Sequence, residues 1–208
     1  MKRGYFITGT DTGVGKTFVT AFLARRAVAL GRRVFAFKPI ETGCNEVDGR
    51  LVGADQSLLQ EAAGPGAPPS GLYRFLDPVA PFVAARETGE AIDLEQIKTT
   101  LDSTACDLAL VEGAGGWRVP ITDSVVMAAL AQRLALLVVL VARADLGTIN
   151  HSLLSIEAIE RDRCTIAAVV LSCLPEDSIA FARSNATEIG RRWPGSVLTT
   201  HDSLDHLL

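Results

Sequence analysis

The sequence predicts an α/β fold in which helices cover both faces of a doubly wound, mainly parallel sheet. Its 208 residues are enough for one domain with a sheet-centred core. Short apolar runs alternate with helix-like segments along the chain, and several of these runs are apolar at consecutive positions. Strands buried on both faces of a parallel sheet have this pattern, whereas half-exposed strands alternate. We therefore expect one domain spanning residues 1–208.

Six apolar runs are predicted strands, and the segments between them are predicted helices. The strands are expected at 4–8, 34–37, 108–111, 136–142, 166–171 and 196–199. The helices are expected at 15–30, 94–101, 124–134, 148–161 and 177–192. Alternating strands and helices with short connections give a doubly wound sheet. The stretch 64–71 is rich in Gly and Pro and is expected to be a loop within the domain.

Residues with helix-end chemistry support three of these helices. Gly31 is suited to ending the first helix. Asp93 is expected to cap the helix at 94–101, with Gln96 three residues on completing a capping-box pattern. Asp123 is expected to cap the helix at 124–134.

The composition is globular, with 48% hydrophobic and 21% charged residues. The net charge of −4 argues against a nucleic-acid-coating surface, so no nucleic-acid partner is expected. The longest apolar stretch, 134–142, is too short to cross a bilayer, and residues 1–4 enter the first strand with no export signal. No membrane contact is therefore expected. The cysteines form no CxxC pair, which favours reduced thiols and a cytoplasmic location: Cys44, Cys106, Cys164 and Cys173.

Residues 9–17, GTDTGVGKT, stand between the first predicted strand and the first predicted helix. Glycines let backbone N–H groups converge on an anion, and the helix start adds a positive dipole end. Lys16 is positioned to reach the β- and γ-phosphates, and the Thr17 hydroxyl to bind Mg²⁺. Thr10 stands where the Walker A pattern has its first glycine, and Gly9 lies one residue further out. A turn that merely ends a strand is the alternative, but the GKT ending between strand and helix favours a variant P-loop and the P-loop NTPase fold.

Three charged side chains are candidate partners for the phosphates and the metal. Glu112 ends a predicted buried strand, at the edge of the sheet that the P-loop also occupies, and a solvated strand-end charge is its alternative role. Asp55 lies at a predicted helix start, where an N-cap and a metal ligand are equally compatible with the sequence. Lys38 follows the second strand in a turn stiffened by proline, which favours a second phosphate-binding cation over a surface lysine.

Taken together, five segments resemble the dethiobiotin synthetase family. They are GTDTGVGKT at 9–17, KPIETG at 38–43, GADQSLL at 53–59, VEGAGGWRVP at 111–120 and RADLGTINHSLLS at 143–155. The resemblance implies that 7,8-diaminononanoate, CO₂ and ATP are converted to dethiobiotin, ADP and phosphate in biotin biosynthesis. One amine becomes a carbamate, the carbamate attacks the γ-phosphate, and the second amine closes the ureido ring.

The same resemblance implies roles for individual residues. Lys16 and Lys38 are expected to act in catalysis, and Mg²⁺ is expected on Thr17, Asp55 and Glu112. The expected nucleotide-binding residues are Gly13, Val14, Gly15, Lys16, Thr17, Phe18, Asp55, Glu112, Gly113, Ala114 and Gly115. The expected substrate-binding residues are Thr12, Lys38, Thr42, Leu146, Gly147 and Asn150. The last three lie at the start of a predicted helix, where backbone N–H groups would bind the substrate carboxylate. In this family the other subunit of a homodimer supplies part of that carboxylate site.

The chain departs from the family pattern at Ser172-Cys173, at residues 198–201 and at Gly13. The first two departures lie where the nucleobase is read, so discrimination among nucleoside triphosphates is expected to be loose. The main alternative function is a ParA/MinD-type switch ATPase, but its early signature lysine is missing from residues 9–12. A GTPase switch would need an [NT]KxD motif, and an amidotransferase-like ligase would need a glutaminase nucleophile, neither of which the sequence supplies.

Overall fold

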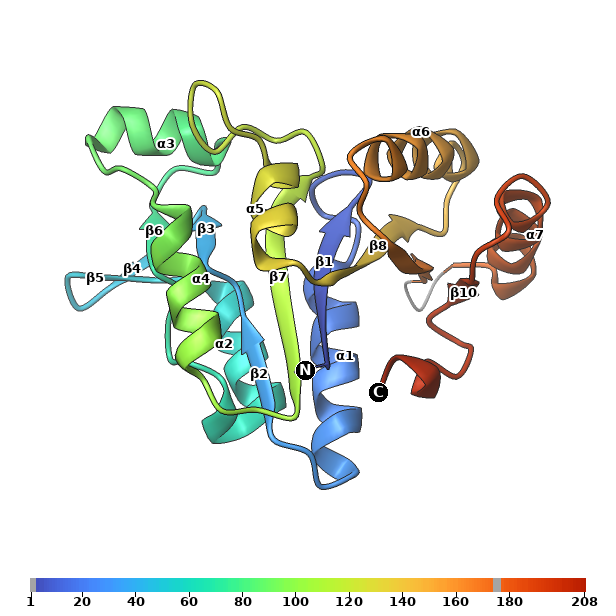
Figure 1. The fold of residues 1–208 in the computed structure, drawn as a ribbon, viewed down its shortest axis with the longest axis horizontal. Helices are drawn as coiled ribbons and strands as arrows, with labels where there is room; N and C mark the ends of the chain where they lie inside the picture. The colour runs from blue at the N-terminus through green and yellow to red at the C-terminus, as the bar shows by residue number, and fades with distance from the viewer. Residues whose placement is uncertain (1–2, 174–176) are drawn as a thin grey trace.

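The computed structural model describes residues 3–173 and 177–208, so the predicted lack of an export signal at 1–4 lies partly outside it. Its centre is a six-stranded sheet in the order β10-β9-β8-β1-β7-β2 (Figure 1). Every neighbouring pair in this sheet is parallel. The strands are β1 (Arg3–Gly9), β2 (Val34–Phe37), β7 (Leu108–Gly116), β8 (Leu137–Arg143), β9 (Ile166–Ser172) and β10 (Val197–Thr199). The predicted parallel α/β sheet is confirmed.

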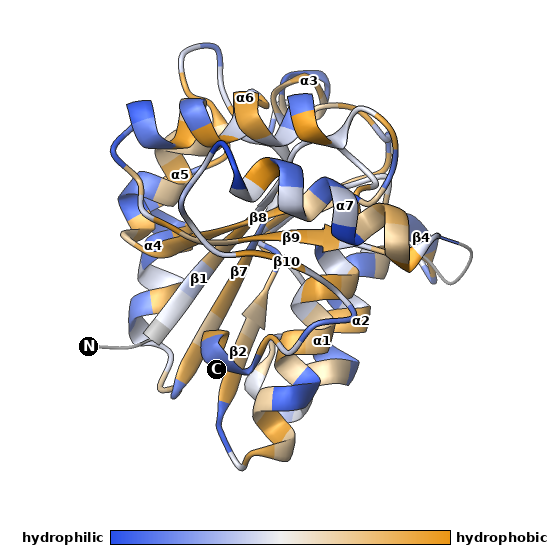
Figure 2. Cartoon of the chain, turned by 90° about the vertical axis from the view of Figure 1, so that its right-hand side faces the viewer, coloured by the Kyte–Doolittle hydropathy of each residue, from blue (hydrophilic) through white to orange (hydrophobic). Residues whose placement is uncertain are grey.

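Helices cover both faces of this sheet, and the strands between them are apolar (Figure 2). One face packs against α1 (Lys16–Ala29) and α2 (Ala54–Ala63). The other packs mainly against α4 (Leu94–Ser103), α5 (Met127–Leu134), α6 (Thr148–Arg161) and α7 (Ile179–Gly190). Adjacent residues of β1 divide between the faces: Phe6 joins the α4–α7 cluster, and Ile7 joins the α1–α2 cluster. This division explains why the strands are apolar at consecutive positions.

Among the described residues, four short strands and helix α3 (Pro81–Thr88) lie beyond the predicted elements, and only the start of α2 was predicted. Parallel strands β3 (Ile40–Thr42) and β6 (Tyr73–Phe75) form a second small sheet, and antiparallel strands β4 (Asn45–Val47) and β5 (Arg50–Val52) form a hairpin. Asp48 and Gly49 have φ of 50° and 71°, the left-handed pair that a two-residue hairpin turn favours. Helix α3 follows β6, and single 3₁₀ turns occupy Gly64–Gly66 and Asp205–Leu207.

Two predicted helix caps have different outcomes. Asp93 caps α4 by accepting from Glu95 N at 2.8 Å, but Gln96 does not return to Asp93 N. Instead Tyr73 Oη accepts from Asp93 N at 2.9 Å and donates to Gln96 Oε1 at 2.6 Å. The predicted cap at Asp123 is wrong, because α5 begins at Met127 with Val126 as its N-cap. The first N–H of this helix, at Met127, donates to the Val119 carbonyl at 2.8 Å.

Within residues 3–173 and 177–208, no helix combines the length and the apolar character that crossing a membrane requires.

Candidate nucleotide and metal site

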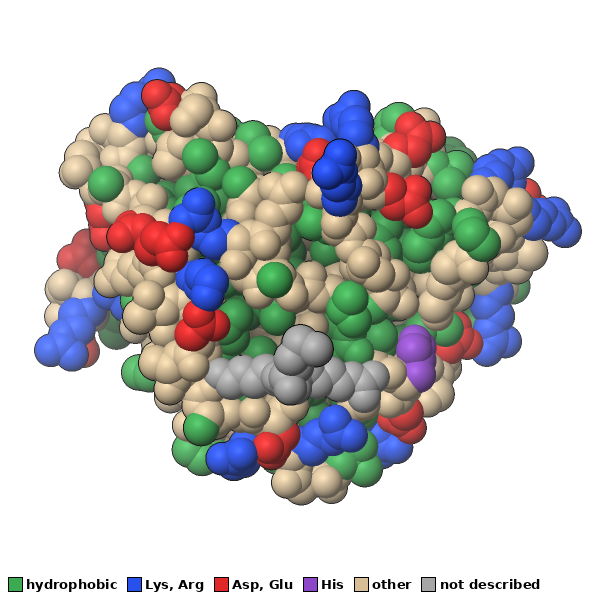
Figure 3. All heavy atoms as spheres, viewed as in Figure 1, with side chains coloured by type: hydrophobic (Ala, Val, Ile, Leu, Met, Phe, Trp, Pro, Cys, Tyr) green, Lys and Arg blue, Asp and Glu red, His purple; other side chains and the backbone are tan. Residues whose placement is uncertain are grey.

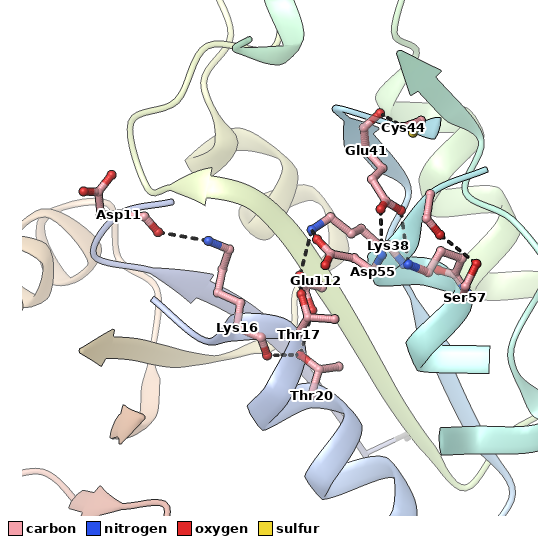
Figure 4. A network of polar contacts seen from close by, with 12 residues as sticks. Asp11, Lys16, Thr17, Thr20, Lys38, Glu41, Cys44, Asp55, Ser57 and Glu112 are labelled. Carbon is pink, nitrogen blue, oxygen red and sulfur yellow. Dashed lines mark hydrogen bonds and ion pairs between the residues drawn. The ribbon is translucent and has the colours of Figure 1, made fainter. Parts of the chain in front are cut away.

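The predicted phosphate loop joins β1 to α1 at the carboxyl edge of the sheet. Gly13 and Gly15 have φ of 69° and 94°, a conformation that favours glycine. An added Cβ at Gly15 would lie 2.2 Å from Ser172 Oγ, so the serine at the end of β9 packs directly under the loop. Lys16 Nζ donates to the Asp11 carbonyl at 3.0 Å, which folds the lysine back across the loop (Figure 4).

A cavity of about 530 Å³ opens beside this loop. It brings together these predicted site residues: Thr12, Gly13, Gly15, Lys16, Thr17, Phe18, Lys38, Thr42, Asp55, Ala114 and Gly115. They come from the P-loop, the first turn of α1, the residue after β2, β3, α2 and the second half of β7. Segments far apart in the sequence therefore converge on one cavity.

Both predicted catalytic lysines line this cavity and are nearly buried: Lys16 is 7% exposed and Lys38 is 6% exposed. Burial lowers the pKa of Lys16 to about 8, with Lys38 also lowering it and Glu112 opposing the shift. Burial would lower the pKa of Lys38 too, but the carboxylates of Glu112 and Asp55 together raise it above the usual lysine value. The surface-lysine alternative for Lys38 is thus wrong. The two lysines line the same cavity.

Glu112 is not among the residues that line the cavity, but its carboxylate links α1 to Lys38. Its side chain is 0% exposed and it is the fifth residue of β7, which continues to Gly116, so the solvated strand-end alternative is wrong. Its Oε1 accepts from Thr17 Oγ1 at 2.8 Å and from Lys38 Nζ at 2.9 Å. Its Oε2 accepts from Thr20 Oγ1 at 3.0 Å. Thr20 was not predicted, although it lies one helical turn beyond Lys16 and donates to the Lys16 carbonyl as well.

Asp55 is the second carboxylate at the site, and it forms an ion pair with Lys38 Nζ. The N-cap of α2 is Gly53, so the N-cap alternative for Asp55 is wrong. Asp55 occupies the second helical position, with its carboxylate toward the cavity (Figure 4).

The donor set fits Mg²⁺. The carboxylates of Asp55 and Glu112 hold the Lys38 ammonium, itself a cation, between them, and the Thr17 hydroxyl donates to the Glu112 carboxylate. In the described parts of the chain, no group of three or more His, Cys, Asp or Glu is arranged to hold a metal by itself. Mg²⁺ commonly uses one or two carboxylates together with substrate phosphates, and this site offers that number.

Other predicted site residues lie outside the cavity. Val14 is buried, and Gly113 packs in the core, where an added Cβ would lie 2.9 Å from the Phe6 ring. Leu146, Gly147 and Asn150 are exposed around the start of α6, and Leu146 is 88% exposed. Leu146 lines a separate depression of about 90 Å³ together with Arg143 and His151. A single chain therefore does not bring these three substrate candidates to the lysines.

Sequence reasoning missed one wall of the cavity. Its apolar residues are Pro78, Val79, Ala80, Pro81 and Val119. The Asp-Pro-Val-Ala-Pro run at 77–81 has no helical or strand period, and the stiffness of its two prolines is the one signal that could have drawn attention to it.

A family model for an AAA domain matches residues 3–206. An ATP-dependent dethiobiotin synthetase of Marinobacter nauticus is 41% identical, over 81% of this chain and 74% of that protein. One of Anaeromyxobacter dehalogenans is 42% identical, over 91% of this chain and 85% of that protein.

Similarity to solved structures is more distant and concerns the fold alone. The septum site-determining protein MinD of Pyrococcus horikoshii has a TM-score of 0.55 at 16% identity, covering 89% of this chain and 77% of that one. The pNOB8 ParA bound to nonspecific DNA has a TM-score of 0.60 at 14% identity, covering 97% and 86%. Both share the fold of this chain, but the dethiobiotin synthetases are far more similar to it in sequence. This chain belongs to the ATP-dependent dethiobiotin synthetase family.

Proposed function

We propose that this protein is a dethiobiotin synthase, a cyclo-ligase that uses ATP and CO₂ to close the ureido ring of dethiobiotin on 7,8-diaminononanoate. The observation that carries the proposal is the shared cavity of Lys16 and Lys38 at the P-loop, in a chain of this family. The reaction needs a cradle for a triphosphate and a place for a second anion beside it, and it needs no covalent nucleophile on the protein.

Both lysines have a role in the proposed reaction. One substrate amine adds to CO₂ and loses a proton, forming a carbamate. A carbamate oxygen bonds to the γ-phosphorus as the bond to ADP breaks. The second amine then attacks the carbamyl carbon, phosphate leaves with the C–O bond electrons, and the nitrogen loses its proton. Lys16 and Lys38 neutralise the charge that gathers on the γ-phosphate and the carbamyl phosphate.

The nucleotide lies on the P-loop in this proposal, with Mg²⁺ held by Thr17, Asp55 and Glu112. The metal supplies charge neutralisation for the phosphate oxygens. The chain's own contribution is rigidity: Glu112 is buried and anchored by two threonine hydroxyls, so its carboxylate is oriented before the nucleotide arrives.

The diamine enters along the apolar wall of Pro78–Pro81, toward Thr12 and Thr42. Its carboxylate reaches Leu146, Gly147 and Asn150 of a second subunit, so the working form is a homodimer with the substrate at the interface. Leu146 is 88% exposed in one chain and is therefore accessible to a second subunit.

A ParA/MinD-type switch ATPase is the second candidate, favoured by the fold similarity to MinD and ParA. The sequence of the phosphate loop opposes it, since residues 9–12 contain no lysine. On the face in Figure 3, acidic and basic side chains are interspersed among apolar ones. A DNA-binding switch would gain more from a continuous basic stripe.

The test is phosphate release and dethiobiotin formation with ATP, Mg²⁺, 7,8-diaminononanoate and bicarbonate, with each component omitted in turn. We expect both products only in the complete mixture, in equal amounts. ATP hydrolysis that ignores the diamine but rises with DNA or lipid vesicles would instead identify the switch ATPase.

A further inference from the structure

Helix α2 begins without a cap of its own. Its N-cap residue is Gly53, which has no side chain to accept from the first turn. The backbone N–H groups that a cap normally satisfies belong to the second and third helical residues, here Asp55 and Gln56. Both donate to one remote carboxylate: Asp55 N to Glu41 Oε1 at 2.8 Å, and Gln56 N to Glu41 Oε2 at 3.1 Å (Figure 4). Glu41 of β3 therefore caps a helix that starts thirteen positions further along the chain.

Glu41 is enclosed, with 4% of the residue exposed. Burial raises its pKa, and the N–H groups of Asp55 and Gln56, together with the Lys38 charge, oppose the shift. The lack of a side chain at Gly53 leaves room for the Glu41 carboxylate, because an added Cβ at Gly53 would lie 2.0 Å from Glu41 Oε2. A serine or aspartate, the usual N-cap residues, would displace Glu41 from the helix end.

Glu41 thereby joins β3 to the first turn of α2, which carries the predicted metal ligand Asp55. Through Asp55 N it holds the residue whose carboxylate pairs with Lys38. Through Gln56 N it holds a side chain whose Oε1 accepts from Lys38 N at 2.7 Å and whose Nε2 donates to the Pro68 carbonyl at 2.8 Å.

Thr42, the next residue in β3, lines the cavity. The backbone of Lys38 and the first turn of α2 are thus locked together through one carboxylate and one amide.

We propose that Glu41 is a positioning residue that sets the Asp55 carboxylate for the metal–nucleotide complex. The inference rests on the proposed role of Asp55 in holding Mg²⁺. Two hydrogen bonds fix the translation and rotation of the first turn of α2, and they aim Asp55 at the same point as Glu112. Groups that orient a metal ligand in this way change metal affinity by about 10- to 100-fold when removed.

Four variants separate positioning from stability. Glu41→Ala removes both acceptors, and Glu41→Gln keeps one. Gly53→Ala keeps the glutamate but pushes its carboxylate away from the start of α2. The atoms that the new Cβ would meet are the end of a flexible side chain, and alanine readily adopts the Gly53 φ of −82°, so the fold tolerates this change. Asp93→Ala is the control, since it removes an acidic cap from α4, away from the cavity.

The readout is ADP binding by calorimetry, in EDTA and across a Mg²⁺ titration, with thermal unfolding recorded for each variant. Mg²⁺ is expected to raise the affinity for ADP above its value in EDTA, and the midpoint is the Mg²⁺ concentration that gives half of this rise. We expect the midpoint to increase about 10-fold or more in Glu41→Ala and Gly53→Ala, and less in Glu41→Gln. Affinity in EDTA should stay within about two-fold, since these changes leave the P-loop intact. Asp93→Ala should lose thermal stability without moving the Mg²⁺ titration.

An unchanged Mg²⁺ titration in Gly53→Ala and Glu41→Gln overturns the proposal, even if Glu41→Ala fails to fold. Equal shifts in Asp93→Ala would also overturn it, because they would trace the effect to stability. The binding readout does not depend on the diamine, so a wild-type chain that makes no dethiobiotin refutes the proposed function while the Glu41 test still gives its own answer.

Discussion

Thr17 Oγ1 donates a hydrogen bond to Glu112 Oε1 across 2.8 Å, joining the first turn of α1 to the middle of β7. The two residues are 95 positions apart. Because the threonine follows the P-loop lysine directly, this bond fixes the distance between the phosphate loop and the buried carboxylate.

Replacing Glu112 by glutamine should weaken the dependence on magnesium. The amide keeps the volume but loses the charge that attracts a divalent ion and balances Lys38. We expect the Mg²⁺ concentration for half-maximal activity to rise about 10-fold or more. Glu61→Gln, on the exposed side of α2, is the control. A metal titration identical to that of the wild type would remove Glu112 from the ligand set.

Lys16→Ala should reduce turnover to background. A charge-assisted hydrogen bond to phosphate contributes about 1.5–3 kcal/mol, so ATP binding should weaken about 10- to 100-fold as well. Calorimetric titration with ATP checks the binding, and phosphate release checks the turnover. Lys98→Ala, which alters an exposed i,i+4 pair on α4, should leave both unaffected. Retained ATP affinity in Lys16→Ala would exclude the phosphate contact.

Lys38→Ala should reduce turnover by about 100-fold or more while ADP binding changes little, since this lysine is assigned to charge that develops during the reaction. The change also removes a positive charge that balances the buried Glu112 carboxylate, so the melting temperature should fall. Lys38→Met, which preserves the packing of the stem, serves as the second variant, and both are assayed well below their melting temperatures. Full turnover in either variant would contradict the assigned role.

Leu146→Asp should raise the KM for the diamine and shift the chain toward monomer. Its side chain is 88% exposed in one chain, and a charge there disfavours an apolar subunit contact. Analytical ultracentrifugation and steady-state kinetics measure the two effects, and Asn150→Ala should raise the KM alone. Leu30→Asp, at the end of α1 and near the amino end of the sheet, is the control. A dimeric Leu146→Asp variant with an unchanged KM would exclude this surface.

Asp202 should stabilise the fold in a pH-dependent way. It accepts from Thr199 N and Thr199 Oγ1, both at 2.8 Å, and the backbone N–H lowers its pKa below the usual 3.8. A depressed folded-state pKa contributes stability above 3.8, and this contribution is lost as the pH falls through the folded-state value.

Urea unfolding of the wild type and Asp202→Asn should therefore differ near about pH 7 and converge as the acid limit is approached. Glu46→Gln, on the exposed β4–β5 hairpin, is the control. A difference that persists unchanged to low pH would mean that the aspartate contributes through shape and not through charge.

Local sequence signals determined much of this protein. Consecutive apolar residues specified the central strands, because burial on both faces removes the alternating pattern, and the limits of α6 were predicted at Thr148 and Arg161. The glycine-rich loop with Lys16 and Thr17 was equally readable, since its conformation depends on the residues of the loop itself. Lys38 and Glu112 were predicted to lie near the P-loop because parallel strands end at one edge of the sheet, although β7 continues past Glu112 to Gly116.

The tertiary structure alone decided how these parts meet. The cap of α2 comes from Glu41 and not from a neighbour, Thr20 completes the anchoring of Glu112, and α5 begins at Met127 because the Val119 carbonyl receives its first N–H. None of these contacts joins helical or strand neighbours, so propensity and periodicity carry no signal for them. Hydrogen bonds of this kind form only after the sheet has brought their donors and acceptors together, so local pattern located the reactive groups and packing set their geometry.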